Sequence, residues 1–345
     1  MSAMELNELI KNLSGLCAPT GFEKPAADYI TALVTPLADE VRSDVMGSVI
    51  AVKRCGKPGA KKLMLEAHMD EIGLIVTGYD KGFLCFSSLG GVDPRMLPGL
   101  EVRICAPAPC YGVIDALPPH ALSAEEMEKA FPADKLRINA GLSEEEAKAR
   151  IPLGTPVVFA SGCTELGEKC LCGKSLDDRA CAAILIKTLE TVQDTELDVD
   201  LYLLFAVQEE IGGRGATTAT FAIAPDHAVA VDVTHAHTPD AKKSETMEFG
   251  KGPAVAVGPN INPVMSDALF RLAKEKDVPV QTEVIPGNSG TDGWEIQISR
   301  EGVSTAVLSL PLRYMHTPVE TLHLDDAENT VRLLSELVRN AGEVL

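Results

Sequence analysis

The second half of the chain alternates helix-like segments with short apolar runs of strand length, and this constrains the fold more than any other feature. The alternation begins near residue 164 and continues almost to the last residue. Because it is typical of helices that cover a mostly parallel or mixed sheet, it predicts an α/β domain. The expected helices are 178–192, 212–221, 264–276 and 325–343, and the expected strands are 201–207, 228–233 and 304–310.

The first 72 residues have the same character, but the segment that follows does not. Helices are expected over 4–16 and 26–37, and strands over 49–52 and 63–67. From residue 73 to 163, short strand-like pieces are closely interrupted by Gly and Pro, which predicts a small β-rich domain. Its expected strands are 73–76, 102–105 and 112–114, and a polar excursion over 118–150 carries a helix at 143–149.

Four of the strand-like runs lead into side chains that could bind a metal ion. His68 and Asp70 follow the first run, Glu209 and Glu210 the second, Asp232 the third and His316 the fourth. Since open α/β sheets bind ligands at the carboxyl ends of their strands, these positions predict one site assembled from distant segments. Such a site requires 1–72 and 164–345 to form one discontinuous α/β domain, with 73–163 inserted into it.

The weaker of these signals have ordinary structural explanations. Asp177 and Asp178 stand at the head of an expected helix, where Asp commonly serves as a cap, although one carboxylate could instead bridge two metal ions. Asp70 lies two residues after His68, so in an extended chain the two project to the same side, and Asp70 could orient the imidazole.

A lone histidine is more often a packed or surface residue than a ligand, and this applies to His316. His235 and His237 compete with it, because an HxH pair can also bind zinc. We rank that pair lower, since it lies beyond its strand in a polar segment.

The pair Glu209-Glu210 is the most informative of the signals. Two carboxylates that end an apolar strand are unfavourable if they are buried without a counter-ion, and a solvated strand end is the alternative. A metal would remove the cost, with one Glu as ligand and its neighbour free to take a proton from water. Adjacent residues leave a strand in opposite directions, which divides the two roles naturally.

Together these donors form a hard-to-borderline set without cysteine, which suits Zn²⁺, Co²⁺ or Mn²⁺. Two ions about 3.5–4 Å apart can share a hydroxide nucleophile and stabilise an oxyanion. A neighbouring Glu would transfer the proton to the leaving amine. The residues therefore predict metal-assisted amide hydrolysis.

Composition excludes several other classes of function. With 31 basic and 50 acidic residues the net charge is −19, which argues against binding nucleic acid or an anionic membrane. No run of about 18 apolar residues is present, so no transmembrane helix is expected. The N-terminus lacks the pattern of a secretory signal. The nine cysteines form no disulfide-type framework, so we expect free thiols and a cytoplasmic protein.

Five motifs resemble the M42 family of dinuclear metallo-aminopeptidases, which includes glutamyl aminopeptidases and the tetrahedral TET peptidases. The motifs are AHMDEIG (67–73), LDDR (176–179), EEIGGRGA (209–216), DVT (232–234) and RYMHTPVE (313–320), and the resemblance covers nearly the whole chain. It implies an exo-aminopeptidase that removes the N-terminal residue from short peptides.

The resemblance also implies a role for each residue of the site. His68 and Asp232 would hold one divalent ion, Glu210 and His316 the other, and Asp177 would bridge them. Glu209 would be the general base and Asp70 the partner of His68. The Asp177–Asp178 peptide bond would be cis. The insertion would be a PDZ-like dimerisation domain, and such dimers commonly build a hollow dodecamer.

The sequence departs from the family pattern at two places, and three rival functions remain. Gly213 replaces an expected leucine, and Gly293-Trp294 stands where small residues are usual. Trp294, the only tryptophan, either packs in the core or shapes the pocket for the first side chain of the substrate.

The rival functions are three. The first is a glycosidase, because some relatives carry a glucanase label. The second is a deacylase or carboxypeptidase with the same metals, and the third is an assembly protein with a structural metal site. The native metal, the preferred first residue and the choice between dimer and dodecamer stay open.

Overall fold

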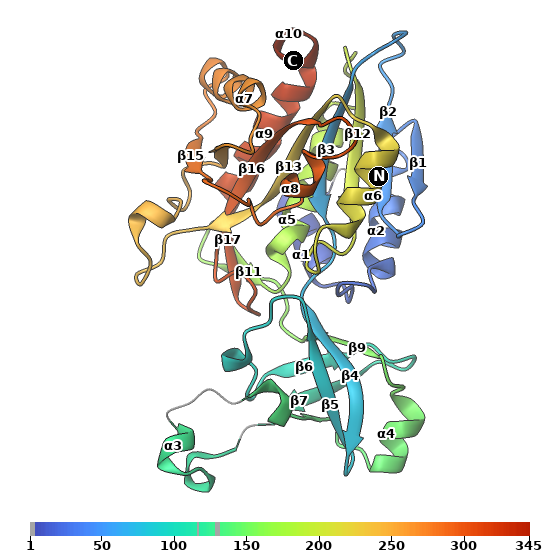
Figure 1. Cartoon of the computed structure of the whole chain (residues 1–345), viewed down its shortest axis with the longest axis vertical. Helices are drawn as coiled ribbons and strands as arrows, with labels where there is room; N and C mark the ends of the chain where they lie inside the picture. The colour runs from blue at the N-terminus through green and yellow to red at the C-terminus, as the bar shows by residue number, and fades with distance from the viewer. Residues whose placement is uncertain (1–3, 116, 128–131) are drawn as a thin grey trace.

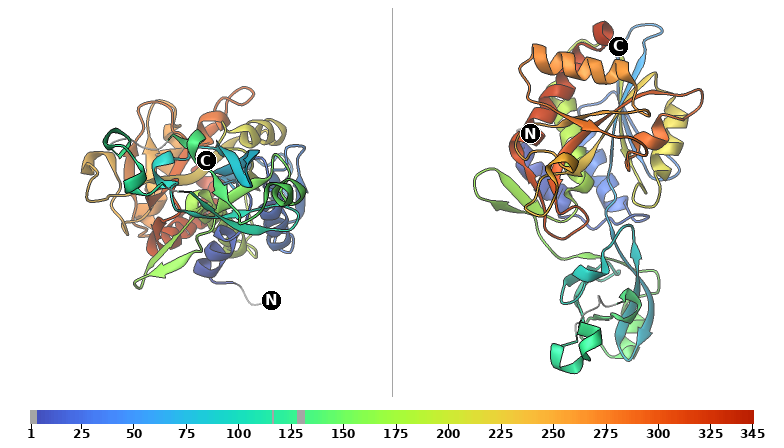
Figure 2. Two further views of the ribbon diagram at one scale, coloured as in Figure 1. Left: turned by 90° about the horizontal axis from the view of Figure 1, so that it is seen from below. Right: turned by 60° about the vertical axis from the view of Figure 1, so that its left-hand side comes forward.

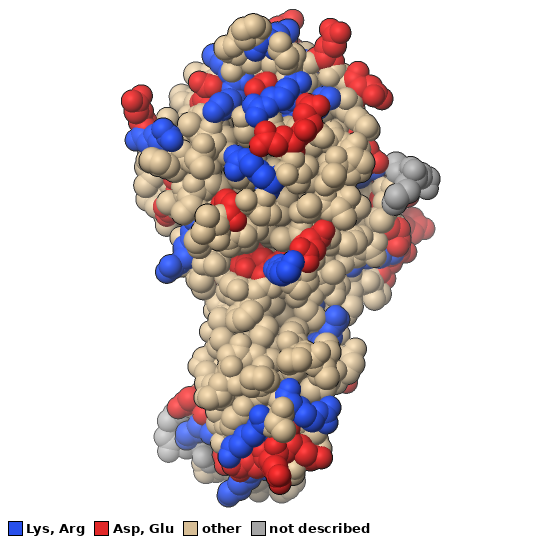
Figure 3. Space-filling view, turned by 90° about the vertical axis from the view of Figure 1, so that its right-hand side faces the viewer, with Lys and Arg blue, Asp and Glu red and all other residues tan. Residues whose placement is uncertain are grey.

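The computed structural model describes residues 4–115, 117–127 and 132–345, and it has a large α/β part joined to a small β-barrel (Figure 1). The expected excursion over 118–150 and the expected insertion 73–163 include residues 116 and 128–131, which lie outside the described residues. The right-hand view in Figure 2 shows the barrel as a separate lobe of the molecule. On the face drawn in Figure 3 the waist between the lobes is nearly free of charged side chains, whereas both lobes carry mixed charges.

The large part is built on one mixed sheet, for which the described residues give eleven strands. Its main path runs β1-β2-β12-β3-β13-β16-β17-β11-β10, and β14 and β15 continue from β16. The four central strands β12, β3, β13 and β16 are parallel, as the alternation predicts. The strand bounds are β1 Glu40–Ser43, β2 Val49–Lys53, β3 Lys62–His68, β10 Thr164–Leu166, β11 Cys170–Gly173, β12 Asp200–Ala206, β13 His227–His235, β14 Ala254–Val257, β15 Gln281–Val284, β16 Ser304–Arg313 and β17 Glu320–His323.

Helices cover both faces of this sheet, so its central strands are buried on both sides. Alternate residues of β3 show the two layers: Leu63 and Leu65 pack in the core under α5 and α9, and Met64 packs on the other face with α6. The helix bounds are α1 Leu6–Ser14, α2 Lys24–Val34, α5 Leu176–Thr191, α6 Arg214–Ile223, α7 Pro263–Glu275, α8 Gly293–Ile296, α9 Leu324–Arg339 and α10 Ala341–Val344. No helix in the described ranges has the length and apolar character needed to cross a membrane.

The small part is a closed barrel in the order β4-β5-β8-β7-β6-β9. Closure leaves no free sheet edge, and the barrel encloses an apolar core that includes Leu74, Val102 and Ile138. Its strands are β4 Gly73–Asp80, β5 Phe83–Leu89, β6 Glu101–Ile104, β7 Cys110–Ile114, β8 Ile138–Asn139 and β9 Pro156–Phe159, with helices α3 Ala124–Met127 and α4 Glu144–Arg150. The predicted fold class, an α/β sheet with an inserted β-rich unit, is therefore confirmed.

Two expected helices differ from the structure in an informative way. The helix expected at 212 begins at Arg214, because Gly212 and Gly213 both have positive φ and form a turn first. The last expected helix is divided at Asn340 into α9 and α10. The short strands β10, β15 and β17 were not predicted, since their polar residues give no apolar pattern of the kind on which the prediction depends, and β11 was not predicted because its four residues are too few to show one.

Candidate metal centre

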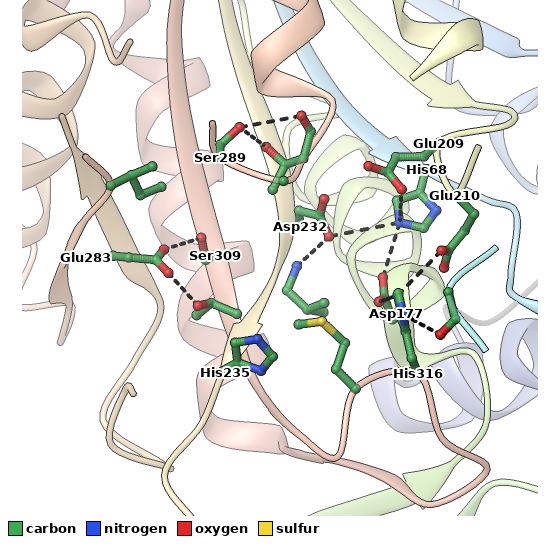
Figure 4. A pocket seen from close by; sticks show the side chains of 17 residues that line it. His68, Asp177, Glu209, Glu210, Asp232, His235, Glu283, Ser289, Ser309 and His316 are labelled. Carbon is green, nitrogen blue, oxygen red and sulfur yellow. Dashed lines mark hydrogen bonds and ion pairs between the residues drawn. The ribbon is translucent and has the colours of Figure 1, made fainter. Parts of the chain in front are cut away.

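A cavity of about 460 Å³ lies at the carboxyl ends of the central strands, beside the loop that leaves the barrel after β5 (Figure 4). It contains six of the seven residues expected in the site, from five separate segments of the chain. These six are His68, Asp177, Glu209, Glu210, Asp232 and His316.

Register and pleat explain why distant residues meet in this cavity. Ala206, the last residue of β12, is paired with His68, so Glu209 and Glu210 follow just beyond that strand end. On β13, Val231 and Val233 point into the core under α5, which turns Asp232 to the opposite face. Asp232 therefore lies on the same face of the sheet as His68.

Asp177 lies between the two histidines. Its Oδ1 is 3.2 Å from Nε2 of His68, and its Oδ2 is 3.3 Å from Nε2 of His316. Each carboxylate oxygen thus faces a different imidazole, which is the arrangement that a bridging ligand needs. The Asp177–Asp178 peptide bond is cis, as the resemblance implies.

The other donors divide into two groups around Asp177. Oε2 of Glu210 lies 3.4 Å from Nε2 of His316, whereas Oδ1 of Asp232 lies 4.0 Å from Nε2 of His68. Oε2 of Glu209 is 3.9 Å from the same nitrogen of His68. Groups able to hold an ion are His68 with Asp178 and Asp232, and Asp177 with Glu210 and His316.

Asp70 is fully buried beneath these residues and contacts three of them, His68, Glu209 and Glu210. Its Oδ1 is 3.4 Å from Nδ1 of His68 and accepts a hydrogen bond from the backbone N–H of Glu209 at 3.1 Å. Its Oδ2 accepts from the backbone N–H of Glu210 at 3.2 Å. Asp70 therefore lies beside the imidazole, where it was expected, and it also holds the backbone of the glutamate pair, a contact that was not predicted.

Glu320, at the start of β17, is a buried supporting residue that the sequence analysis missed. One carboxylate oxygen accepts from the backbone N–H groups of Leu176 and Asp177 at 2.7 and 3.1 Å, and the other accepts from that of His316 at 2.9 Å. Its carboxylate joins the segment that carries Asp177 to the loop that carries His316. The sequence offered one signal for Glu320: it is the last residue of the motif RYMHTPVE, which contains His316.

The barrel side of the cavity also contributes to the site. The carbonyl oxygen of Gly91 lies 3.2 Å from Nδ1 of His316, so this nitrogen can donate to it while Nε2 faces Asp177. A Cβ at Gly91 would lie 2.8 Å from the same Nδ1, so the backbone approaches the ring as closely as only glycine permits.

Electrostatics within the cavity favour bound cations. Burial raises the pKa of Glu209 and of Glu210 to about 9 each, and nearby carboxylates add to the effect. Burial also raises the pKa of Asp232 to about 7. Asp177 behaves differently: burial opposes its charge, but its contacts with His316 and His68 lower its pKa below the ordinary value.

The histidines respond to the same carboxylates. Burial acts to lower the pKa of His68, but its contacts with the carboxylates of Asp177 and Asp70 raise it well above the ordinary value. The bond to Asp177 raises the pKa of His316. The described lining of the cavity contains no Lys or Arg to balance the acidic groups. Nitrogen and oxygen donors in this number, with excess negative charge, fit two divalent ions.

The structure also places the histidines that compete with His316 as possible ligands, and the residues that differ from the family pattern. His235 lines the cavity away from the two donor groups, and His237 lies 3.3 Å from the hydroxyl of Thr246. Trp294 is half-buried and lines a neighbouring cavity of about 140 Å³ beside Glu209. Gly213 lines it too, with φ +61°, and a Cβ there would lie 2.7 Å from Glu295. A leucine cannot occupy that position without displacing its neighbours.

A sheet with an inserted barrel and a histidine–carboxylate cluster at its strand ends is an arrangement that can support metal-assisted hydrolysis. The family model described as M42 glutamyl aminopeptidase matches residues 47–333, and the chain belongs to that family. It is an aminopeptidase-family hydrolase that acts on peptide bonds, as the resemblance implies.

Three relatives illustrate the similarity. The lysyl aminopeptidase of Pyrococcus furiosus is 39% identical over 337 residues, which cover 96% of each chain. The TET1 peptidase of Pyrococcus horikoshii, described as able to assemble into a tetrahedron or a large octahedral shell, is 30% identical with a TM-score of 0.86, covering 97% of this chain and 99% of that one. A structure described as an endoglucanase from Thermotoga maritima is 32% identical with a TM-score of 0.79, covering 97% and 98%.

Proposed function

We propose that this protein is a metal-dependent exo-aminopeptidase that removes the N-terminal residue from short peptides. The observation that carries the proposal is the position of Asp177, each of whose oxygens faces the Nε2 atom of a different histidine. His68 and Asp232 would hold one divalent ion, and Glu210 and His316 would hold the other. Zn²⁺ and Co²⁺ suit these donors, and Mn²⁺ is also compatible.

Two divalent ions, when bound, would lower the pKa of water and polarise the scissile carbonyl. Glu209 would then act as the general base: its carboxylate lines the cavity but belongs to neither donor group. In this position its carboxylate can take a proton from water and return it to the leaving amine. Asp70 would keep the ring of His68 and the backbone of Glu209 in place.

The charge of the cavity favours an aminopeptidase over its rivals. A carboxypeptidase needs a cation for the C-terminal carboxylate of its substrate, and the described lining has no Lys or Arg. A free N-terminal ammonium, by contrast, is attracted to an acidic cavity. A glycosidase needs two carboxylates flanking a sugar bond, and it does not call for carboxylates arranged around two histidines. The lysyl aminopeptidase name of one relative supports the same choice.

We further propose that residues 1–72 and 164–345 form the catalytic domain and that 73–163 form a dimerisation domain. The closed barrel, which stands apart from the sheet, supports this division (Figure 2). The tetrahedral and octahedral assemblies of a similar peptidase support a homo-oligomer built from such dimers. Light scattering of the purified protein distinguishes a dimer from a dodecamer.

The function is tested with protein stripped by a chelator and reloaded with Zn²⁺, Co²⁺ or Mn²⁺. We expect the reloaded protein to cleave a free dipeptide amide and to leave its N-acetylated form intact. Glu209→Gln should retain its metal content, measured by elemental analysis, and lose about a hundredfold or more of its turnover, because the base is missing. Cleavage of only the blocked substrate would overturn the aminopeptidase assignment, and full activity of Glu209→Gln would overturn that of the base.

A further inference from the structure

Apart from Glu209, the described lining of the cavity has one carboxylate outside the two groups of possible metal ligands. Glu283 lies on β15, at the far side of Asp232 from the pair Glu209-Glu210 (Figure 4). It belongs to neither group of possible metal ligands. Its position in the cavity therefore needs another explanation.

The sheet places Glu283 a short distance from the candidate metal centre. Asp232 is paired in register with Ser309 on the adjacent strand β16, so the two lie about 4.8 Å apart across the sheet. Ser309 is paired in turn with β14, which pairs with β15. The side chain of Glu283 reaches back across β14, and its Oε2 accepts a hydrogen bond from the hydroxyl of Ser309 at 2.7 Å.

Two hydroxyl groups hold this carboxylate in place without neutralising it. The hydroxyl of Thr234 donates to Oε1 of Glu283, and that of Ser309 donates to Oε2. A carboxylate accepts about four hydrogen bonds, so roughly two positions remain available. Among the described residues no Lys or Arg forms an ion pair with Glu283. Other carboxylates of the protein do form ion pairs, for example Glu40 with Arg54 and Asp325 with Lys169.

The wall between Glu283 and the metal centre suits an aliphatic stem. Ile285 and Met315 line the same cavity, and Ile285 lies two residues after Glu283, on the same side of the chain. Lysine and arginine bury their methylene stems along apolar surface and present a charged end group beyond it.

We propose that Glu283 selects substrates whose N-terminal residue is lysine or arginine, by pairing with the ammonium or guanidinium group of that side chain. The inference rests on the proposed function, because it takes the scissile bond to lie at the metal centre. Ser309 and Thr234 are positioning residues that hold the carboxylate toward the substrate.

The test compares lysyl, arginyl, norleucyl and glutamyl p-nitroanilides with the metal-loaded enzyme. Norleucine has the stem of lysine without its charge, so the ratio of the kcat/KM values for lysyl and norleucyl substrates isolates the ion pair. We expect the wild type to prefer the cationic substrates, and Glu283→Gln to reduce the ratio by about tenfold or more, mainly through KM. Glu283→Lys should shift the preference toward the glutamyl substrate. Glu301→Gln, an exposed change of the same charge, should leave the ratio as it is.

A direct binding measurement separates this inference from the proposed function. In a Glu209→Gln background, calorimetry should show that Lys-Ala binds at least about tenfold more tightly than norleucyl-Ala, and that adding Glu283→Gln removes the difference. A wild type that prefers norleucyl or glutamyl substrates, or equal binding of the two dipeptides, would overturn the role of Glu283 and leave the aminopeptidase assignment standing. If no free peptide is cleaved but Lys-Ala still binds selectively, the proposed function fails and the cation site remains.

Discussion

Replacing Glu320 with glutamine should weaken metal binding without unfolding the protein. The carboxylate of Glu320 accepts three backbone N–H groups, at 2.7 and 3.1 Å from Leu176 and Asp177 and at 2.9 Å from His316. In Glu320→Gln the amide oxygen can still accept two of them. The amide NH₂ group then faces the N–H of His316, so one buried donor loses its partner and meets another donor.

The size of the effect follows from that lost contact. An unsatisfied buried donor costs about 1–3 kcal/mol. If the loop that carries His316 moves to relieve it, the same free energy is lost from metal binding. At about 1.4 kcal/mol per tenfold, this weakens metal affinity roughly 5- to 150-fold. The range agrees with the tenfold to hundredfold losses usual when groups that orient metal ligands are changed.

Zinc affinity can be measured by competition with a chromophoric chelator, on the wild type, on Glu320→Gln and on the exposed control Glu301→Gln. Circular dichroism and thermal melting check that each variant is folded. We expect Glu320→Gln to bind zinc more weakly at one or both sites. The control Glu301→Gln should keep the affinity of the wild type. Wild-type affinity at both sites in a folded Glu320→Gln protein would refute the reasoning, because it would show that the backbone contacts of Glu320 do not position the ligands.

Two further predictions concern the surroundings of the site. Glu71 is buried with Lys174 and Arg179, and Glu71→Gln should lower the free energy of unfolding by about 3 kcal/mol, measured by urea denaturation, since both cations lose their partner. Burial acts to raise the pKa of Glu71, but Arg179 and Lys174 lower it below the ordinary 4.5. The stabilisation that Glu71 gives is therefore present above about pH 4.5 and is lost as the pH falls through the lower pKa of the folded state. Glu71→Gln should lack this part of the loss of stability in acid, and a variant whose stability falls with pH as in the wild type would contradict the assignment. Gly91→Ala should weaken binding of one metal about tenfold in calorimetry, because its Cβ would lie 2.8 Å from Nδ1 of His316. Gly162→Ala, where a Cβ meets nothing within 4 Å, is the matched control, and equal affinities in the two variants would contradict the steric argument.

The sequence predicted best those features that depend on apolar periodicity. The parallel strands β12, β3, β13 and β16 are long apolar runs, and their ends identified His68, Glu210 and Asp232 as neighbours in space. Spacing alone could not choose between His316 and the pair His235-His237, because loops carry no periodic signal.

The residues that the sequence analysis missed act through tertiary contacts. Glu320 and Glu283 lie on short strands with mixed polarity, and each depends on groups far away in the chain. Asp70 was expected to orient His68, but its bonds to the backbone of Glu209 and Glu210 need the fold to be seen. Local patterns cannot predict such contacts, since they follow from which strands become neighbours.

The carbonyl of Gly91 brings the barrel into contact with the candidate metal centre. This residue follows β5, yet its oxygen lies 3.2 Å from Nδ1 of His316, while Nε2 of the same ring faces Asp177. A donor bond from Nδ1 leaves the lone pair on Nε2, the atom that faces the other ligands. The barrel therefore supplies an acceptor that favours the Nδ1–H tautomer of a residue 225 positions later in the sequence. Any protein made by deleting the barrel or exchanging it for another module would have to supply an equivalent acceptor, and a barrel that tilts against the sheet would change how strongly His316 can bind an ion.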